Sequence, residues 1–408
     1  MFPNLPLELV EVIFTGLDTK SLRTCALLSS STLESSQRLL FRSVVIDDEH
    51  VPHAQSLLEG SPHIAGYIHD LDVRLSNDTP QWVDLSALGS ILTTDKLCNL
   101  KSLTLRGEDR DWAKLPSLLQ NGLHSFLAST YLHTLNLTHI HGVPPSLIIA
   151  ALSSVRRLGL YQLTIDAIDN SLDSHPRSRP PIPRTEHLIR RETHYLEGQS
   201  FLVDLITVPK GGPAYLENVR RLAVSMYLEI LPDSLRLIGA TANTLRHLEL
   251  GCGGPRFTTL SVQPLIYNTD MPQPIDLPFL PSLQIIELKV YLGNPVHVPE
   301  NLHVAIATFP TTIPAIELIR LTFHRPMYPQ GRATWMDSTG PFPVLNHSYG
   351  ERLPRLRTVH CHMWSEGHFD EPYPYFDAFI HERFPGLEGT GVLTISAGGD
   401  EYDDLLFS

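Results

Sequence analysis

The first forty residues carry apolar side chains with the period of an α-helix. Leu9, Ile13 and Leu17 recur every four residues, which places them on one face of a helix. Pro6 fits the first turn of that helix, because its missing N–H would have no partner there. Two further helices with the same period are predicted, one ending near residue 30 and one near residue 40. Three such short helices bury little surface by themselves, so this segment is expected to need a partner.

From residue 46 the period of the apolar positions changes. Short segments of the form apolar-x-x-apolar-x-apolar return along the rest of the chain, with the alternation of a β-strand that has one buried face. Their spacing is irregular, and the widest gap separates Val155 from Val219. The pattern predicts a series of similar strands. Their apolar residues are Ile68, Leu71, Val73; Leu100, Leu103, Leu105; Leu132, Leu135, Leu137; Val155, Leu158, Leu160; Val219, Leu222, Val224; Leu245, Leu248, Leu250; Leu283, Ile286, Leu288; Ile316, Ile319, Leu321; and Leu356, Val359, Cys361.

These segments resemble leucine-rich repeats. The resemblance implies an α/β fold in which each repeat gives one strand to a curved parallel sheet and returns on the outside. Because the spacing is ragged, we expect an irregular leucine-rich-repeat solenoid over residues 46–408. A generic α/β domain is the alternative.

The side chains between the apolar positions of each strand point to the opposite side of the sheet. In the repeat hypothesis this side is the concave face, and its mixture of charges suits a protein or peptide ligand. Arg157, Tyr161 and Arg221 are the expected anchors, because Tyr and Arg are enriched in binding hot spots. Recognition by the loops is the alternative. The predicted substrate-recognition residues are Thr104, Arg106, Asn136, Arg157, Tyr161, Arg221, Glu249, Lys289, His360 and His362.

The widest gap between strands contains a stretch rich in proline and arginine, over residues 173–184. Clustered prolines disfavour a helix or a central strand, so a loop insertion is predicted over residues 170–212. Its basic cluster is interpreted as a solvated loop, with binding of an acidic peptide as the alternative. The cluster consists of Arg177, Arg179, Arg184, Arg190 and Arg191.

Residues 1–45 resemble the F-box family in the form common among fungi. The resemblance rests on the pattern Leu5-Pro6-x-Glu8-Leu9, on the following helices, and on the exit sequence of residues 40–44, Leu-Phe-Arg-Ser-Val. The family usually has Trp where this chain has Thr32. A helical segment that merely caps the domain behind it is the alternative.

This resemblance implies that the helices dock onto the Skp adaptor, and through it onto the cullin, of an SCF-type ubiquitin ligase. The repeats would then select the target protein, and the chain itself would be a non-catalytic adaptor subunit without a cofactor. The residues expected to bind the adaptor are Leu5, Pro6, Glu8, Leu9, Ile13, Leu17, Leu22, Cys25, Leu28 and Ser29.

Composition narrows the class of protein. The chain has 408 residues, 42% of them hydrophobic and 18% charged, which is ordinary for a globular protein. A net charge of -13 argues against a sequence-independent nucleic-acid binder, which needs a basic surface for phosphates. The four cysteines lie far apart and predict neither disulfides nor a zinc site. Without a signal peptide or a long apolar run, a cytoplasmic or nuclear location away from the membrane is expected.

Two motifs point toward other functions. The sequence Leu-Glu-Leu-Gly-Cys-Gly-Gly at residues 248–254 resembles the first motif of S-adenosylmethionine-dependent methyltransferases, although Pro255 stands where a third glycine is expected. His360, Cys361 and His362 invite a metal hypothesis. On a strand, however, the two histidines and the cysteine would face opposite sides, so no metal site is predicted. A methyltransferase and a repeat scaffold without any ligase remain the alternatives to the ligase subunit.

Overall fold

The computed structural model folds into two compact α/β units. Unit 1 comprises Met1–Thr185 and Leu196–Tyr215, and unit 2 comprises Glu186–Tyr195 and Leu216–Ser408. The chain therefore passes into unit 2, returns to unit 1 and enters unit 2 again. The structure describes residues 7–76, 85–93, 97–129, 132–166, 183–191, 199–207, 215–225, 231–252, 277–291, 313–324, 353–364 and 376–398.

Unit 1 begins with the three predicted helices, α1 (Leu7–Thr15), α2 (Thr19–Leu28) and α3 (Ser30–Leu40). Phe14 and Leu22 are buried between them. Thr32, which stands where F-box proteins usually have Trp, is also buried, and its hydroxyl donates a hydrogen bond of 2.7 Å to the carbonyl of Cys25. This bond ties α3 to the end of α2.

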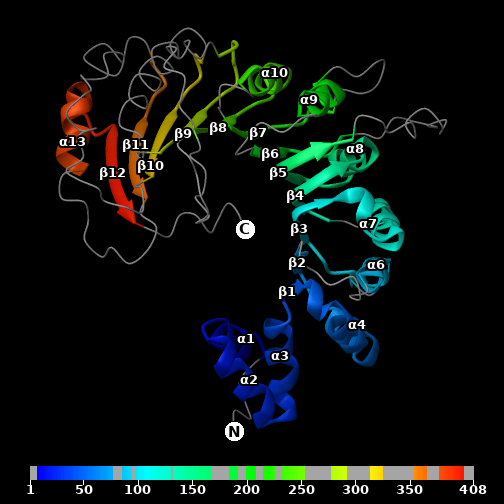
Figure 1. The fold of residues 1–408 in the computed structure, drawn as a ribbon. Helices are drawn as coiled ribbons and strands as arrows, with labels where there is room; N and C mark the ends of the chain where they lie inside the picture. Colours follow the sequence, from blue (N-terminus) through cyan, green and yellow to red (C-terminus); the bar gives the residue numbers. More distant parts are fainter. Residues whose placement is uncertain are drawn as a thin grey trace, which may run out of the picture. The chain divides into compact units, whose positions relative to one another are not determined.

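The sheet of unit 1 contains five parallel strands in the order of the sequence (Figure 1). Leu71, Leu103, Leu135 and Leu158 occupy one register position on successive strands. Because all four are buried, they form one continuous row of the core. The strands are β1 (Ser43–Asp47), β2 (Asp70–Arg74), β3 (Ser102–Asp111), β4 (Thr134–Val143) and β5 (Arg157–Ile165).

Helices α4, α6, α7 and α8 lie on one side of this sheet, as Figure 1 shows. The fully buried Leu88, Leu119 and Leu147 come from α6, α7 and α8. The helical segments are η1 (Asp48–His50), α4 (Val51–Gly60), α5 (Pro62–Ala65), α6 (Ser86–Thr93), η3 (Trp112–Lys114), α7 (Ser117–Ser129), α8 (Pro145–Ser154) and α9 (Gln199–Thr207).

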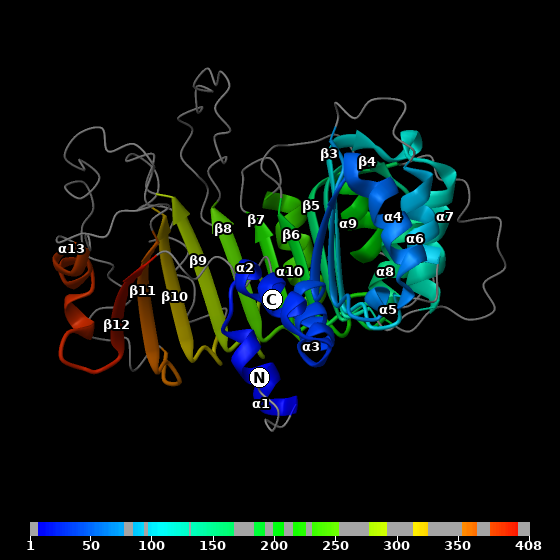
Figure 2. The ribbon, with the colours of Figure 1, turned by 90° about the horizontal axis from the view of Figure 1, so that it is seen from below.

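Unit 2 repeats the same construction with seven parallel strands, which lie in sequence order in Figure 2. Leu222, Leu248, Ile286, Ile319 and Val359 share one register position and are completely buried. The elements are β6 (His187–Arg191), β7 (Arg221–Ser225), α10 (Leu231–Thr241), β8 (His247–Cys252), β9 (Ile285–Tyr291), β10 (Leu318–His324), β11 (Thr358–Trp364), α13 (Phe376–Arg383), η7 (Pro385–Leu387) and β12 (Leu393–Gly398).

The predicted strands and core are confirmed. Every apolar residue of the nine predicted segments is buried, and the most exposed of them, Leu356, reaches only 7%. The fold is thus an α/β arrangement around parallel, open sheets, as the repeat pattern predicts at this coarser level.

Three strands were missed by the sequence pattern. The segment leading into β6 has Thr185 at its first apolar position and Arg190 at its third, so it does not read as a repeat. Thr185 is nevertheless buried, because its hydroxyl hydrogen-bonds to the carbonyls of Leu152 and Val155. The predicted loop insertion at 170–212 is therefore wrong for β6 and α9, whereas residues 167–182 lie outside the described ranges.

The other two missed strands lie at the ends of the repeat series. β1 continues the pattern through Phe41, Val44 and Ile46, so the sheet begins at Ser43, before the predicted boundary at residue 46. β12 pairs its Leu393 with Val359 at the other end. The last two residues of the segment 40–44, Ser43 and Val44, thus begin the first strand.

Candidate functional site

The candidate site is the side of each sheet that faces away from the buried leucine rows. We call it the polar face; it is formed by the residues between the apolar positions of each strand. All ten predicted substrate-recognition residues lie on strands of these sheets. Each unit has its own polar face, and the two are described separately.

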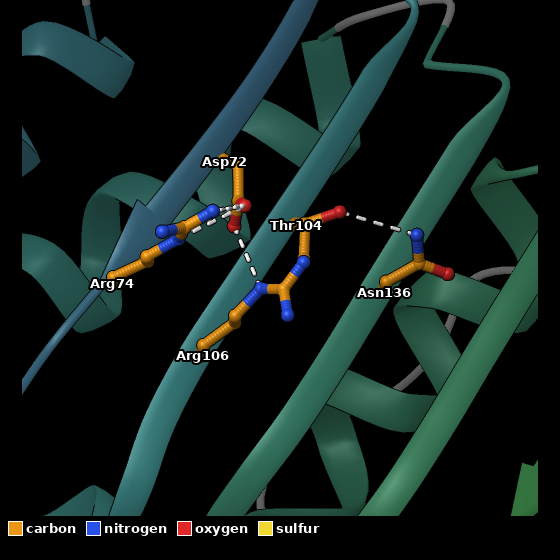
Figure 3. A network of polar contacts seen from close by, with 5 residues as sticks. All are labelled: Asp72, Arg74, Thr104, Arg106 and Asn136. Carbon is orange, nitrogen blue, oxygen red and sulfur yellow. Dashed lines mark hydrogen bonds and ion pairs between the residues drawn. The ribbon is translucent and has the colours of Figure 1, made fainter. Parts of the chain in front are cut away.

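On the polar face of unit 1, Asp72 holds two arginines (Figure 3). Its carboxylate accepts hydrogen bonds from Nε of Arg106 at 3.0 Å and from Nε of Arg74 at 3.3 Å. On the neighbouring strands, Nδ2 of Asn136 donates to Oγ1 of Thr104 at 3.2 Å. Asp72 was missed as a site residue, although it lies between the apolar residues Leu71 and Val73, just as Thr104 lies between Leu103 and Leu105.

The expected anchors Arg157 and Tyr161 both lie on β5 and are half-buried. The space beside them depends on Gly159, which occupies the same register position as Asn136. A Cβ on Gly159 would lie 2.6 Å from Cε2 of Tyr161 and would also meet the Asn136 amide. Glycine at this position therefore permits both side chains to lie against the sheet.

The ends of β3, β4 and β5 share an irregular backbone. Asp109, His139 and Gln162 have φ values of 67°, 53° and 52°, a left-handed conformation that is unfavourable for these residues. There, Oδ1 of Asp109 lies 3.4 Å from Nδ1 of His139 and 3.7 Å from Nε2 of His141. The bulges turn polar side chains of adjacent strands toward one another.

On the polar face of unit 2, buried charges form a connected network. Nζ of Lys289 lies 2.9 Å from Oε1 of Glu249 and 3.8 Å from Oε1 of Glu287. Glu249 is only 2% exposed and also pairs with Arg191 of β6. The second carboxylate, Glu287, lies 3.6 Å from Nη1 of Arg320. The prediction placed Glu249 and Lys289 on the same face without pairing them, and it placed Arg191 in a loop.

The cations of this network keep both carboxylates ionised. Burial by itself raises the pKa of Glu249, but Arg191 and Lys289 outweigh it and lower this pKa to about 2. For Glu287, burial likewise raises the pKa, while the neighbouring His247, whose Nε2 lies 3.8 Å from Oε2, and the charges of Lys289 and Arg320 lower it below its usual value. Both side chains are therefore structural anions near neutral pH.

At β11 the predicted alternation is confirmed. The hydroxyl of Ser396 lies 2.8 Å from Nε2 of His360 and 2.8 Å from Nδ1 of His362, so both histidines point to the polar face. Cys361 is fully buried on the other side, and burial raises the pKa of its thiol. Across the described ranges, no cluster of three or more acidic, histidine or cysteine side chains is arranged to hold a metal ion.

The methyltransferase motif falls largely on β8. Its acidic residue, Glu249, is occupied by the ion pairs with Arg191 and Lys289. Gly253 and Gly254 lie outside the described residues. A buried carboxylate that neutralises two cations is a poor hydrogen-bond acceptor for a cofactor hydroxyl.

The residues expected to bind the adaptor divide into exposed and buried groups. Leu9, Ile13 and Leu28 are 49%, 47% and 69% exposed, and Ser29 is exposed as well. Leu22 is buried. The half-buried members are Leu17 and Cys25; Leu5 and Pro6 lie outside the described residues, and the side chain of Glu8 is not described.

Three further apolar side chains on these helices are exposed, namely Val12, Leu27 and Leu33. They escaped the sequence prediction because they fall off the i, i+4 stripe. Together with Leu9, Ile13 and Leu28 they give the short helical segment six of the exposed large apolar residues found in the described chain. We call these six residues the exposed apolar set.

Comparison with models of known protein families finds no match for this chain, and a search of curated proteins likewise finds no significant relative. Among the described helices, none combines the length and apolarity needed to cross a bilayer. Fold and site define the protein as an α/β protein with parallel sheets, a polar face on each unit and an N-terminal three-helix segment.

Proposed function

We propose that the chain is the substrate-recruiting subunit of an SCF-type cullin-RING ubiquitin ligase. The N-terminal helices would dock onto a Skp-type adaptor, and the polar faces would hold the target protein. The observation that carries this proposal is the exposed apolar set on α1, α2 and α3, in a segment whose sequence resembles an F-box.

The concentration of exposed apolar residues in this segment needs a physical explanation. Isolated apolar side chains on a surface are ordinary, but a concentration of them within one short segment marks a binding surface. The buried positions of the three helices are taken by other residues, among them Phe14, Leu22 and Thr32. Val12, Ile13 and Leu28 are therefore available to a partner.

Tethering explains how such a protein would act without its own catalytic residues. Holding the ligase at one end and the target at the other converts ubiquitin transfer into an effectively intramolecular reaction. No covalent chemistry is required of the polar faces, whose carboxylates are held as ion pairs by Lys289 and Arg191.

The first prediction tests docking by co-purification with a Skp adaptor. Ile13→Glu and Leu28→Glu should each abolish co-purification, because a charge would be buried without a partner at a cost of several kcal/mol. As a matched control, Leu57→Glu places the same charge on α4, at a leucine that is also exposed. This control should bind like the unchanged chain.

Retained adaptor binding in the Ile13→Glu/Leu28→Glu double variant would refute docking through these helices. If the unchanged chain fails to bind any Skp adaptor, a repeat scaffold without a ligase becomes the better description. Calorimetry with S-adenosylmethionine tests the methyltransferase alternative. A methyltransferase should show a saturable heat of binding to this cofactor, and we expect no such heat.

A further inference from the structure

The polar face of unit 2 carries more positive than negative charge. Its described strand residues include Arg191, Arg221, Lys289 and Arg320, opposed by two carboxylates, those of Glu249 and Glu287. The chain as a whole has a net charge of -13. This face therefore has the opposite sign from the rest of the protein, which favours an anionic partner.

The two carboxylates do not satisfy all of these cations. Lys289 contacts both of them, and Glu287 is in addition the ion-pair partner of Arg320. Arg221 has no described ion-pair partner within 4.0 Å, although its charge acts on Glu249 from further away and helps to lower the pKa of that carboxyl group. Nε of Arg221 and Nε of Arg320 are both buried without a hydrogen-bond acceptor. Because buried donors without acceptors are costly, ligand carboxylates that draw these guanidinium groups into new hydrogen bonds would be favourable.

The positions of these arginines define the length of a ligand. Arg221 lies on β7 and Arg320 on β10, three strand spacings apart across the sheet and two residues apart in register, which together correspond to about 16 Å. An extended peptide covers this distance in roughly four to five residues, at about 3.4 Å per residue. Both arginines are only partly buried, so their outer nitrogens can reach a ligand.

We infer that the polar face of unit 2 binds an extended acidic segment of a partner protein, with two carboxylates spaced to meet Arg221 and Arg320. The partner's role as a ubiquitination target rests on the proposed function, whereas the binding itself does not. Arginine suits this task, since its planar group can engage a carboxylate through two parallel hydrogen bonds.

The test uses the purified full-length chain without any adaptor. Its binding is measured to two sets of labelled short peptides, one with glutamates about four to five residues apart and one with glutamines at the same places. The glutamate peptides should bind at least about tenfold more tightly, and Arg221→Gln/Arg320→Gln should remove this preference. Arg246→Gln is the matched control, because Arg246 is exposed and precedes β8 rather than belonging to the strand.

A variant that should bind more tightly is included, because a loss of binding alone could also result from misfolding. Glu287→Gln removes the carboxylate that competes for Arg320, so it should strengthen binding of the glutamate peptides. The chain's own acidic C-terminus could compete, so every measurement is repeated with Asp400, Asp403 and Asp404 changed to Asn and Glu401 to Gln.

Equal binding of glutamate and glutamine peptides in both backgrounds would overturn the inference. So would an equal loss of binding in Arg246→Gln and in the double variant. Neither outcome depends on the adaptor, so a failure here is distinguishable from a failure of docking by α1, α2 and α3.

Discussion

At the scale of single residues, the charge network of unit 2 makes a testable statement about pH. Glu249 has a pKa lowered from about 4.5 to about 2 in the folded protein. A carboxyl group with a depressed pKa stabilises the fold above its unfolded value, and this stabilisation is lost as the pH falls through the folded value. The relevant window is therefore pH 4.5 down to about 2.

We expect Glu249→Gln to lower the free energy of unfolding at pH 7, because Arg191 and Lys289 lose their shared buried anion. The difference from the unchanged protein should shrink as the pH falls from 4.5 toward 2, where the original carboxylate is itself becoming protonated. Urea unfolding at several pH values measures this. A difference that stays constant with pH would show that the charge of Glu249 is not responsible.

Sequence alone predicted the side of the sheet for these residues, but not their partners. Side chains along a strand alternate between its two sides, and this alternation can be followed in a few consecutive residues. The pattern of leucines was therefore sufficient to place Glu249, Lys289 and the two histidines of β11 on the polar face. The pairing of Glu249 with Arg191 joins residues on β6 and β8, which are distant in sequence. No local pattern carries that information.

At the scale of elements, the stacked leucine rows should dominate stability. Leu135 is completely buried in β4, between its register partners on β3 and β5. Leu135→Ala should therefore destabilise unit 1 by about 2–5 kcal/mol. Leu118→Ala in α7 is the control, since Leu118 is 42% exposed and its truncation should cost much less. Similar losses in the two variants, measured by thermal unfolding, would contradict the assigned core.

β6 was missed because its sequence lacks some of the apolar residues that define the repeat pattern. Thr185 replaces an apolar residue before β6, and its hydroxyl compensates by hydrogen bonding to the carbonyls of Leu152 in α8 and of Val155 directly after that helix. Arg190 occupies a register position that the next two strands, β7 and β8, fill with Val224 and Leu250. A search for apolar side chains cannot find a strand when two of its core positions, Thr185 and Arg190, are polar.

At the scale of the whole molecule, the division into two units predicts the behaviour of fragments. Unit 1 includes α9, whose Leu202, Val203 and Ile206 are buried. A fragment ending at residue 215 keeps this helix, whereas one ending at residue 185 loses it. We expect the longer fragment to have the higher melting temperature, because the shorter one exposes the surface that α9 covers. Equal melting temperatures would mean that α9 does not belong to unit 1.

The interleaved path of the chain also sets the order of events during synthesis. The ribosome releases β6 of unit 2 before α9 of unit 1, and β7, the described partner of β6 in unit 2, follows later still. Domains commonly fold one after another as they emerge, each complete before the next begins. This chain cannot follow that schedule, because its first unit is finished only after its second has been started.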